Sequence, residues 1–403
     1  MVGEDEGALV HPGAGASGGA VPGGAATGSA AGRDRCLDLL RAVALVRIVA
    51  YHTFGGALFS IVFPAMGIMF ALAGSLMAAS LQRPAGSVLR SRSRRLLVPL
   101  WVYSTTVLTL FVLGGWVPGE QGTGPWYRVL LWFVPLADPP YPGELGDGTG
   151  PLDPSWPVQA GEILWYIRAY LWFVLLSPLL LRLYRSRPWP TFLAPLGLLL
   201  LLEPGAVPLP DPVSAVLTDL AVYGSCWILG FAHHDGRLRR LPRRFVLVAG
   251  PVVMALGLWW ALAHPTEQGL DLNGIPVGQA LWSAGFCAVL LRLSPRWQVL
   301  PRPLRFLDGA VTLLNRRAVT VYLWHNLMIA LTVPLMEPVY AVDALWESVP
   351  WLLGTSWPDF LLAWALLSGV LLAVGWAEDV AARRRPRPWP TGSRRGAGRG
   401  RTG

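Results

Sequence analysis

An arginine and a histidine, Arg41 and His52, lie eleven positions apart in the first long apolar run, residues 37–59. Ionisable side chains inside a membrane helix are costly and by default mark a functional site. Eleven residues make about three helical turns, so the two side chains share nearly one face, roughly 16 Å apart along the axis. Because a neutral imidazole can take a proton from a hydroxyl, this pattern favours His52 as a general base. The structural alternatives are a buried imidazole bonded to a neighbouring helix and, for Arg41, a helix-end residue paired with Asp38.

A second polar group is the segment 90–95, which we expect to be a loop and which holds Arg90, Arg92, Arg94 and Arg95. Membrane topology alone requires positive charge in such a loop. Four arginines in six residues exceed that requirement, and guanidinium groups bind phosphates bidentately. The segment is therefore a candidate site for the phosphates of an anionic cofactor.

Four further charged or titratable side chains fall inside apolar runs: Arg47, Arg168, Asp219 and His325. Arg47 lies about 120° around the helix from Arg41, so we expect it to face a different neighbour. Asp219 and His325 each have a structural alternative, as an interhelical hydrogen-bond partner and as a core histidine. The sequence contains no Gly-rich nucleotide loop, no serine elbow and no metal-ligand cluster, so we expect no metal.

The composition is that of a membrane protein. Of 403 residues, 53% are apolar and 14% are charged, whereas about a quarter of the residues of a soluble protein are charged. Apolar runs of about 20 residues predict one all-α domain with ten transmembrane helices. The fifth is the weakest, because it is short and contains Pro195. The expected spans are 37–57, 60–81, 96–117, 163–183, 190–203, 214–232, 245–263, 276–293, 318–336 and 357–377.

The charges of the connecting segments alternate along the chain. Arginine-rich segments alternate with acidic segments that together hold one arginine, Arg128. The positive-inside rule then places both termini in the cytoplasm, and one span more or fewer would put a basic segment outside. Since topology explains the net charge of +9, we expect membrane lipid and no nucleic acid as a partner, and we expect the plasma (cell) membrane as the location.

The ends of the chain differ from its centre. Residues 1–34 are rich in Gly and Ala and have no apolar core, which predicts a disordered tail rather than a signal peptide. Residues 381–403 are rich in Arg, Pro and Gly and are also expected to be disordered. The transmembrane domain is expected over residues 35–380. Within it, the apolar stretch 126–135 is too short to span and predicts an interfacial or re-entrant segment.

An ordered set of short motifs resembles the membrane acyltransferase-3 family. That family begins with an arginine, ten intervening residues and a histidine, followed by an Ala-Gly or Ser-Gly helix, an Arg-x-x-Arg segment, a Leu-Trp-Phe segment and a late Tyr-Leu-x-His helix. The matching segments are 37–42 with His52, 63–74, 92–101, 164–167 and 322–325. Ala73 stands where serine is common, and we expect no C-terminal esterase-like domain of the kind that some members carry.

The resemblance implies an O-acyltransferase that uses acyl-CoA, with acetyl-CoA as the expected donor. It implies catalytic roles for His52 and Arg41. Because the family's loop arginines map onto Arg92 and Arg95, we expect these two and Arg94 to hold the donor phosphates. Acyl-CoA would be a co-substrate, with no permanently bound cofactor. Direct transfer and an acyl-histidine intermediate both remain open.

The expected acceptor is a hydroxyl of a glycan, a lipid-linked sugar or a small metabolite. We expect His325, Trp324 and Arg168 to contribute to its binding. A transporter or flippase of a lipid-linked sugar is the alternative function, because many spans and intramembrane charges suit it as well. A non-catalytic membrane scaffold would leave Arg41 and His52 unexplained.

Overall fold

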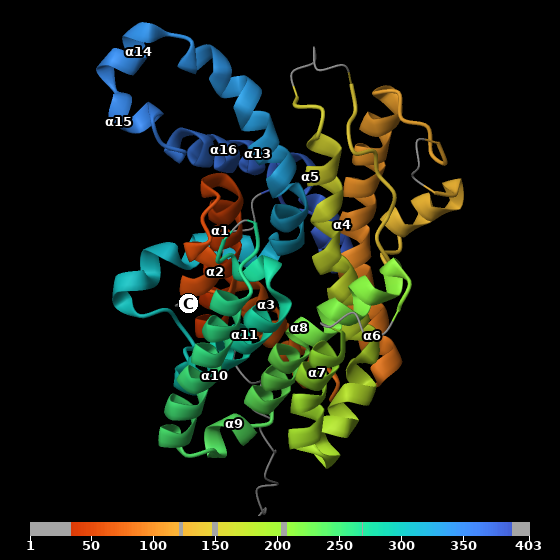
Figure 1. The fold of residues 1–403 in the computed structure, drawn as a ribbon, viewed down its shortest axis with the longest axis vertical. Coiled ribbons are helices and arrows are strands. Elements are labelled where there is room, and N and C mark those ends of the chain that lie inside the picture. The colour runs from red at the N-terminus through yellow and green to blue at the C-terminus, as the bar shows by residue number, and fades with distance from the viewer. Residues whose placement is uncertain (1–33, 121–123, 147–151, 203–207, 268, 389–403) are drawn as a thin grey trace, which may run out of the picture. The chain divides into compact units, whose positions relative to one another are not determined.

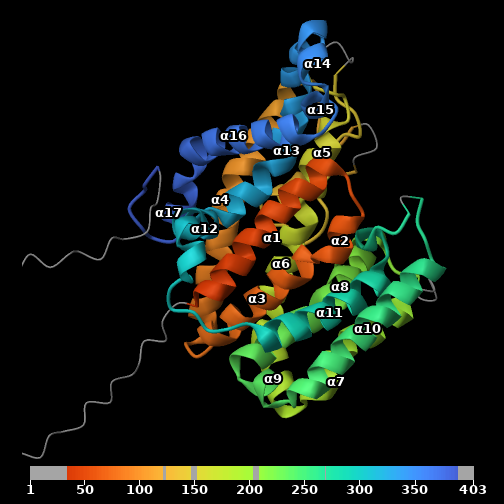
Figure 2. The ribbon, with the colours of Figure 1, turned by 90° about the vertical axis from the view of Figure 1, so that its left-hand side faces the viewer.

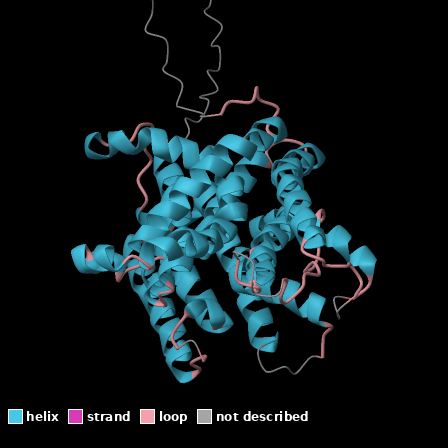
Figure 3. Cartoon of the chain, turned by 90° about the horizontal axis from the view of Figure 1, so that it is seen from above, coloured by secondary structure: helices cyan, strands magenta, loops and turns pink. Residues whose placement is uncertain are grey.

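The computed structural model describes residues 34–120, 124–146, 152–202, 208–267 and 269–388, and these form helices joined by short loops, with no sheet strand among them (Figures 1 and 3). The first half contains α1 (Arg35–Phe54), α2 (Leu58–Val62), α3 (Ala65–Ser80), α4 (Ala85–Leu113), η1 (Trp126–Trp132), α5 (Trp156–Glu162), α6 (Leu164–Ser186), α7 (Pro188–Leu202) and α8 (Asp211–His234). The second half contains α9 (Arg237–Arg240), α10 (Arg243–Ala263), η2 (Leu272–Gly274), α11 (Pro276–Leu293), η3 (Arg302–Leu307), α12 (Asp308–Arg316), α13 (Ala318–Tyr340), α14 (Asp343–Ser348), α15 (Pro350–Leu353), α16 (Trp357–Val374) and α17 (Trp376–Ala381).

Eight helical stretches of the described residues are long and apolar enough to cross a membrane, which confirms an all-α, multi-pass membrane protein. They are Leu58–Ser80, Ala85–Leu113, Trp156–Ser186, Asp211–His234, Arg243–Ala263, Pro276–Leu293, Ala318–Tyr340 and Trp357–Val374. The first and fifth expected spans are also helical, as α1 and the 15-residue α7. α1 differs from the eight because every stretch of 18 residues within it contains at least three charged residues, Asp38, Arg41 and Arg47. The total of ten spans and the cytoplasmic termini stay predictions.

The segments that flank the expected spans were also predicted from the sequence. We expected the segment 90–95 to be a loop. In the structure it is part of α4, which begins after Pro84. That expectation was wrong because proline at a helix start is compatible with a helix that extends beyond the apolar run. The expected tails fall on residues 1–33 and 389–403, which lie outside the described residues. The short segment after Pro125 forms the 3-10 helix η1.

The two ends of α1 are set by capping residues. The side chain of Asp34 accepts a hydrogen bond from the backbone N–H of Cys36 at the start of the helix. Gly55 ends the helix with a φ of 64°, a left-handed conformation in which glycine is not strained, and its N–H donates to the carbonyl of Tyr51. His52 therefore lies in the last turn of α1, where the helix opens towards the loop before α2.

The centre of the bundle is α3, which contacts α1 on one side and α8 and α11 on the other (Figure 2). α3 and α8 cross with their backbones in contact. A Cβ atom at Gly74 would lie 2.2 Å from the carbonyl oxygen of Trp227, and one at Gly230 would lie 2.1 Å from that of Ala71. Small residues allow such close approach between membrane helices. The crossing holds α8 near α1 and so positions both for a shared site.

We predict that Gly230→Ala destabilises the protein by about 1–3 kcal/mol, because the added methyl group forces α3 and α8 apart. Thermal unfolding of the purified protein in detergent, followed by intrinsic fluorescence, measures the effect. Gly197→Ala in α7 is the matched control, since a Cβ atom there meets nothing within 4 Å. Equal melting temperatures for the two variants would contradict the close crossing.

Candidate functional site

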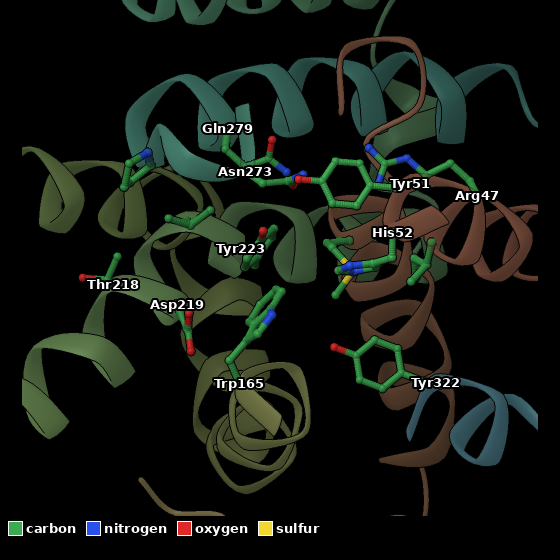
Figure 4. A pocket seen from close by; sticks show the side chains of 14 residues that line it. Arg47, Tyr51, His52, Trp165, Thr218, Asp219, Tyr223, Asn273, Gln279 and Tyr322 are labelled. Atoms are coloured by element: carbon green, nitrogen blue, oxygen red, sulfur yellow. The ribbon is translucent and has the colours of Figure 1, made fainter. Parts of the chain in front are cut away.

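A cavity of about 370 Å³ opens beside the end of α1. Fourteen side chains line it, and Figure 4 labels ten of them. They come from α1, α3, α6, α8, α11, α13 and the turn η2, so segments far apart in the sequence meet here. The wall combines aromatic rings with a few polar groups, which is typical of small-molecule sites.

One histidine lines this cavity, and a second histidine, which is not part of the lining, packs against it. His52 of α1 lines the cavity and is exposed, whereas His325 of α13 is 1% exposed. Their ring centroids are 4.9 Å apart, with the planes at 62°. The Nδ1 atom of His325 hydrogen-bonds to the carbonyl of Tyr322, and a carbonyl only accepts, so the ring donates from Nδ1. Its Nε2 atom is left as an acceptor with no hydrogen-bond partner among the described residues.

Arg41 lies nearer the start of α1, away from this cavity, whose lining does not include it. Its guanidinium interacts electrostatically with Tyr166, Tyr170, Asp38 and Arg92, and it forms no hydrogen bond or ion pair with the described residues. The carboxylate of Asp38, an expected alternative partner, forms an ion pair with Arg35 at 2.9 Å. Arg41 thus keeps its donors available for an anionic ligand.

A pair of tyrosines lies between the surroundings of Arg41 and those of His52. Tyr166 interacts with Arg41, and its ring centroid is 4.7 Å from that of Tyr322. Tyr322 in turn lies 5.5 Å from His325 and donates its hydroxyl hydrogen to the carbonyl of Ile163 at 2.9 Å. This buried aromatic pair separates the two polar regions of α1 and is held by a hydrogen bond to the start of α6.

The arginines at the start of α4 have different partners. The Nη2 atom of Arg92 donates to the carbonyl of Leu76, at 3.1 Å, and to the hydroxyl of Ser80, at 2.7 Å, so this side chain binds the end of α3. Arg95, one helical turn further, is exposed and interacts electrostatically with Arg92, without an ion pair to the described residues. These like charges, close to Arg41, form a region that favours an anion.

The third of these arginines, Arg94, connects α4 to the helix α17. Its Nε atom donates to the carbonyl of Ala381 at 2.8 Å. The other side of α17 is held by an ion pair between Arg317 and Asp379, at 2.7 Å, in which Arg317 is fully buried. α17 therefore fixes the position of the basic end of α4.

The remaining expected acceptor residues lie apart from His325. Arg168 is 4% exposed, and its guanidinium pairs with Asp138 and, at 2.6 Å, with Asp219. Asp219 lines the cavity, so Arg168 reaches that site only through this carboxylate. The indole of Trp324 packs edge-on against Tyr103 at 5.3 Å and is not part of the cavity lining.

Several residues of the cavity were not expected from the sequence. Arg47 and Tyr51 were not expected beside His52, yet both line the cavity. A helical signal was available, because positions 47, 48, 51 and 52 are spaced i, i+1, i+4 and i+5 and share a face. Gln279 carried no such signal, since it reaches the cavity from α11 through tertiary packing.

The comparisons with known proteins identify the family of this chain. Residues 34–378 match the family model Acyl_transf_3, described as an acyltransferase domain, and the match runs from the start of α1 into the first turn of α17. No curated protein and no solved structure matches the chain. The family match covers nearly the whole chain, including the cavity, both histidines and the basic end of α4. The chain belongs to the Acyl_transf_3 family and is a multi-pass membrane acyltransferase.

Proposed function

We propose that this protein transfers an acyl group, first of all acetyl, from acyl-CoA to a hydroxyl of a glycan, a lipid-linked sugar or a small metabolite, at the plasma membrane. The observation that carries the proposal is the pair of histidines. His52 is exposed in a cavity large enough for a small ligand, and the buried His325 presents an unpartnered Nε2 atom beside it. An imidazole in this setting is suited to general-base catalysis.

The proposed reaction forms one carbon–oxygen bond, breaks one carbon–sulfur bond and moves one proton from the hydroxyl to the thiolate. His52 accepts the proton of the acceptor hydroxyl while the hydroxyl oxygen attacks the thioester carbonyl. The carbon–sulfur bond then breaks, and the proton on His52 passes to the CoA thiolate. After a small ring rotation, the Nε2 atom of His325 accepts a hydrogen bond from His52, which fixes the tautomer that faces the acceptor. An acyl-histidine intermediate on His52 is compatible with the same geometry.

The donor would bind at the other polar region of α1. CoA is anionic, and in this region Arg41 and Arg95 form neither a hydrogen bond nor an ion pair with the described residues. Arg92 and Arg94 were also expected to hold phosphates, and they remain proposed ligands. Because the guanidinium of Arg92 already binds the end of α3 and that of Arg94 binds α17, we expect these two to contribute less to phosphate binding than Arg41 and Arg95. A pantetheine arm would pass the Tyr166–Tyr322 pair to reach His52.

The alternative function, transport of a lipid-linked sugar, receives less support. Membership of an acyltransferase family favours group transfer, and a transporter would not consume acyl-CoA. Purified protein incubated with labelled acetyl-CoA separates the two functions, because release of CoA is expected of the enzyme alone.

We predict that His52→Ala lowers acyl transfer by about 10²–10⁴-fold, the usual contribution of a general base. His325→Ala should lower kcat less, because this residue orients His52 rather than carrying the proton. Transfer is measured in membranes that contain equal amounts of each variant. His264→Ala is the control, since His264 is exposed and stacks on Trp260. Full activity of the His52 variant would remove this residue as the base.

We also predict that Arg95→Gln raises the donor KM by about tenfold or more, because a charge-assisted hydrogen bond to a phosphate is lost. The double variant with Arg92→Gln should raise it further. Arg90→Gln is the matched control, since Arg90 is an exposed arginine on the same helix. Steady-state kinetics with varied acetyl-CoA gives the donor KM, and an unchanged value in the double variant would contradict the donor site.

A further inference from the structure

The arginines around the cavity beside His52 already interact with aspartates. The guanidinium of Arg168 pairs with Asp219 and Asp138. The charge of Arg47 interacts with Asp271, whose carboxylate accepts a hydrogen bond from the hydroxyl of another cavity residue, Tyr51. Two arginines therefore face three aspartates, and the described surroundings offer no excess of positive charge to an anionic ligand.

Two polar atoms of the lining lack hydrogen-bond partners among the described residues. They are the Oε1 atom of Gln279 and the Nη2 atom of Arg47. Both residues are buried, with Gln279 2% and Arg47 9% exposed. The Nε atom of Arg47 donates to the carbonyl of Phe59 at 3.0 Å, so the guanidinium is held in place. Leaving such atoms unpaired is costly. Both residues line the cavity, where a ligand can supply the missing partners.

The geometry of the wall suits a flat, compact ligand. In Figure 4, Gln279, Tyr51 and Arg47 lie along one side of the view, and His52 lies between them and Tyr322. Below Gln279 in the view, Trp165 stacks on Tyr223, with ring centroids 5.6 Å apart and planes at 23°. Such aromatic faces pack well against the apolar face of a ring.

We propose that this cavity binds an uncharged ring with neighbouring hydroxyl groups and that Gln279 and Arg47 determine this specificity. One hydroxyl donates to Oε1 of Gln279, and a neighbouring oxygen accepts from Nη2 of Arg47. A hydroxyl can both donate and accept, whereas a carboxylate accepts only and an ammonium group donates only. A carboxylate would leave Oε1 of Gln279 unpaired, and an ammonium group would leave Nη2 of Arg47 unpaired. That this ring is the acyl acceptor rests on the proposed function, whereas its binding does not.

Saturation-transfer-difference NMR on the purified full-length protein tests the proposal without catalysis. The probes are methyl α-D-glucopyranoside, which is uncharged, the corresponding methyl glucuronoside, which carries a carboxylate, and methyl glucosaminide, which carries an amine. We expect the uncharged glycoside to bind best. Gln279→Met, which keeps the size of the side chain without its oxygen, should weaken its binding by about tenfold.

Ser283→Ala provides the matched control. Ser283 is a buried residue one turn further along α11, also without a partner for its hydroxyl among the described residues, and it lies outside the cavity lining. This variant should bind the uncharged probe as the wild type does. Equal or stronger binding of a charged probe overturns the proposal, as does unchanged affinity in Gln279→Met. Loss of acyl transfer alone would count against the proposed function and leave the binding result standing.

Discussion

The structure around α1 depends on the cost of placing charge inside an apolar bundle. A charged group in such a bundle needs a partner or a ligand. Arg35 has its partner within the helix, at Asp38, and Arg47 is held by a carbonyl of α2. Arg41 lacks such a partner among the described residues, and His52 is exposed in a cavity. The neighbouring helices are arranged so that these two groups remain available.

This arrangement divides the site into two polar regions along one helix. The region of Arg41 is cationic and receives further positive charge from the start of α4, whose position α17 fixes through Arg94. The region of His52 is a cavity whose arginines already interact with aspartates. Its unpartnered atoms, on Gln279 and Arg47, suit an uncharged ligand. The Tyr166–Tyr322 pair lies between them, so an anionic and an uncharged substrate can be kept apart until their reacting atoms meet.

Much of the helical architecture follows from local sequence. The first span was expected at 37–57 and is found at Arg35–Phe54, because Asp34 and Gly55 are capping residues with local effects. The segment 90–95 was misjudged, because its arginines were interpreted through topology alone, while the backbone there continues the helix that starts after Pro84. A charge pattern indicates on which side of the membrane a segment lies, but it does not indicate where a helix begins or ends.

The sequence by itself determined that Arg41 and His52 lie on one helix about three turns apart, since helical periodicity relates residues close in the chain. It also determined the membrane class, because apolar runs of sufficient length have few other solutions. The tertiary structure alone decided which side chains surround them. His325 reaches His52 from 273 positions further along the chain, and Gln279 arrives from α11 through the packing of α3, α8 and α11. Such contacts depend on how whole helices cross, including the backbone contact at Gly74 and Gly230, and no local pattern encodes that geometry.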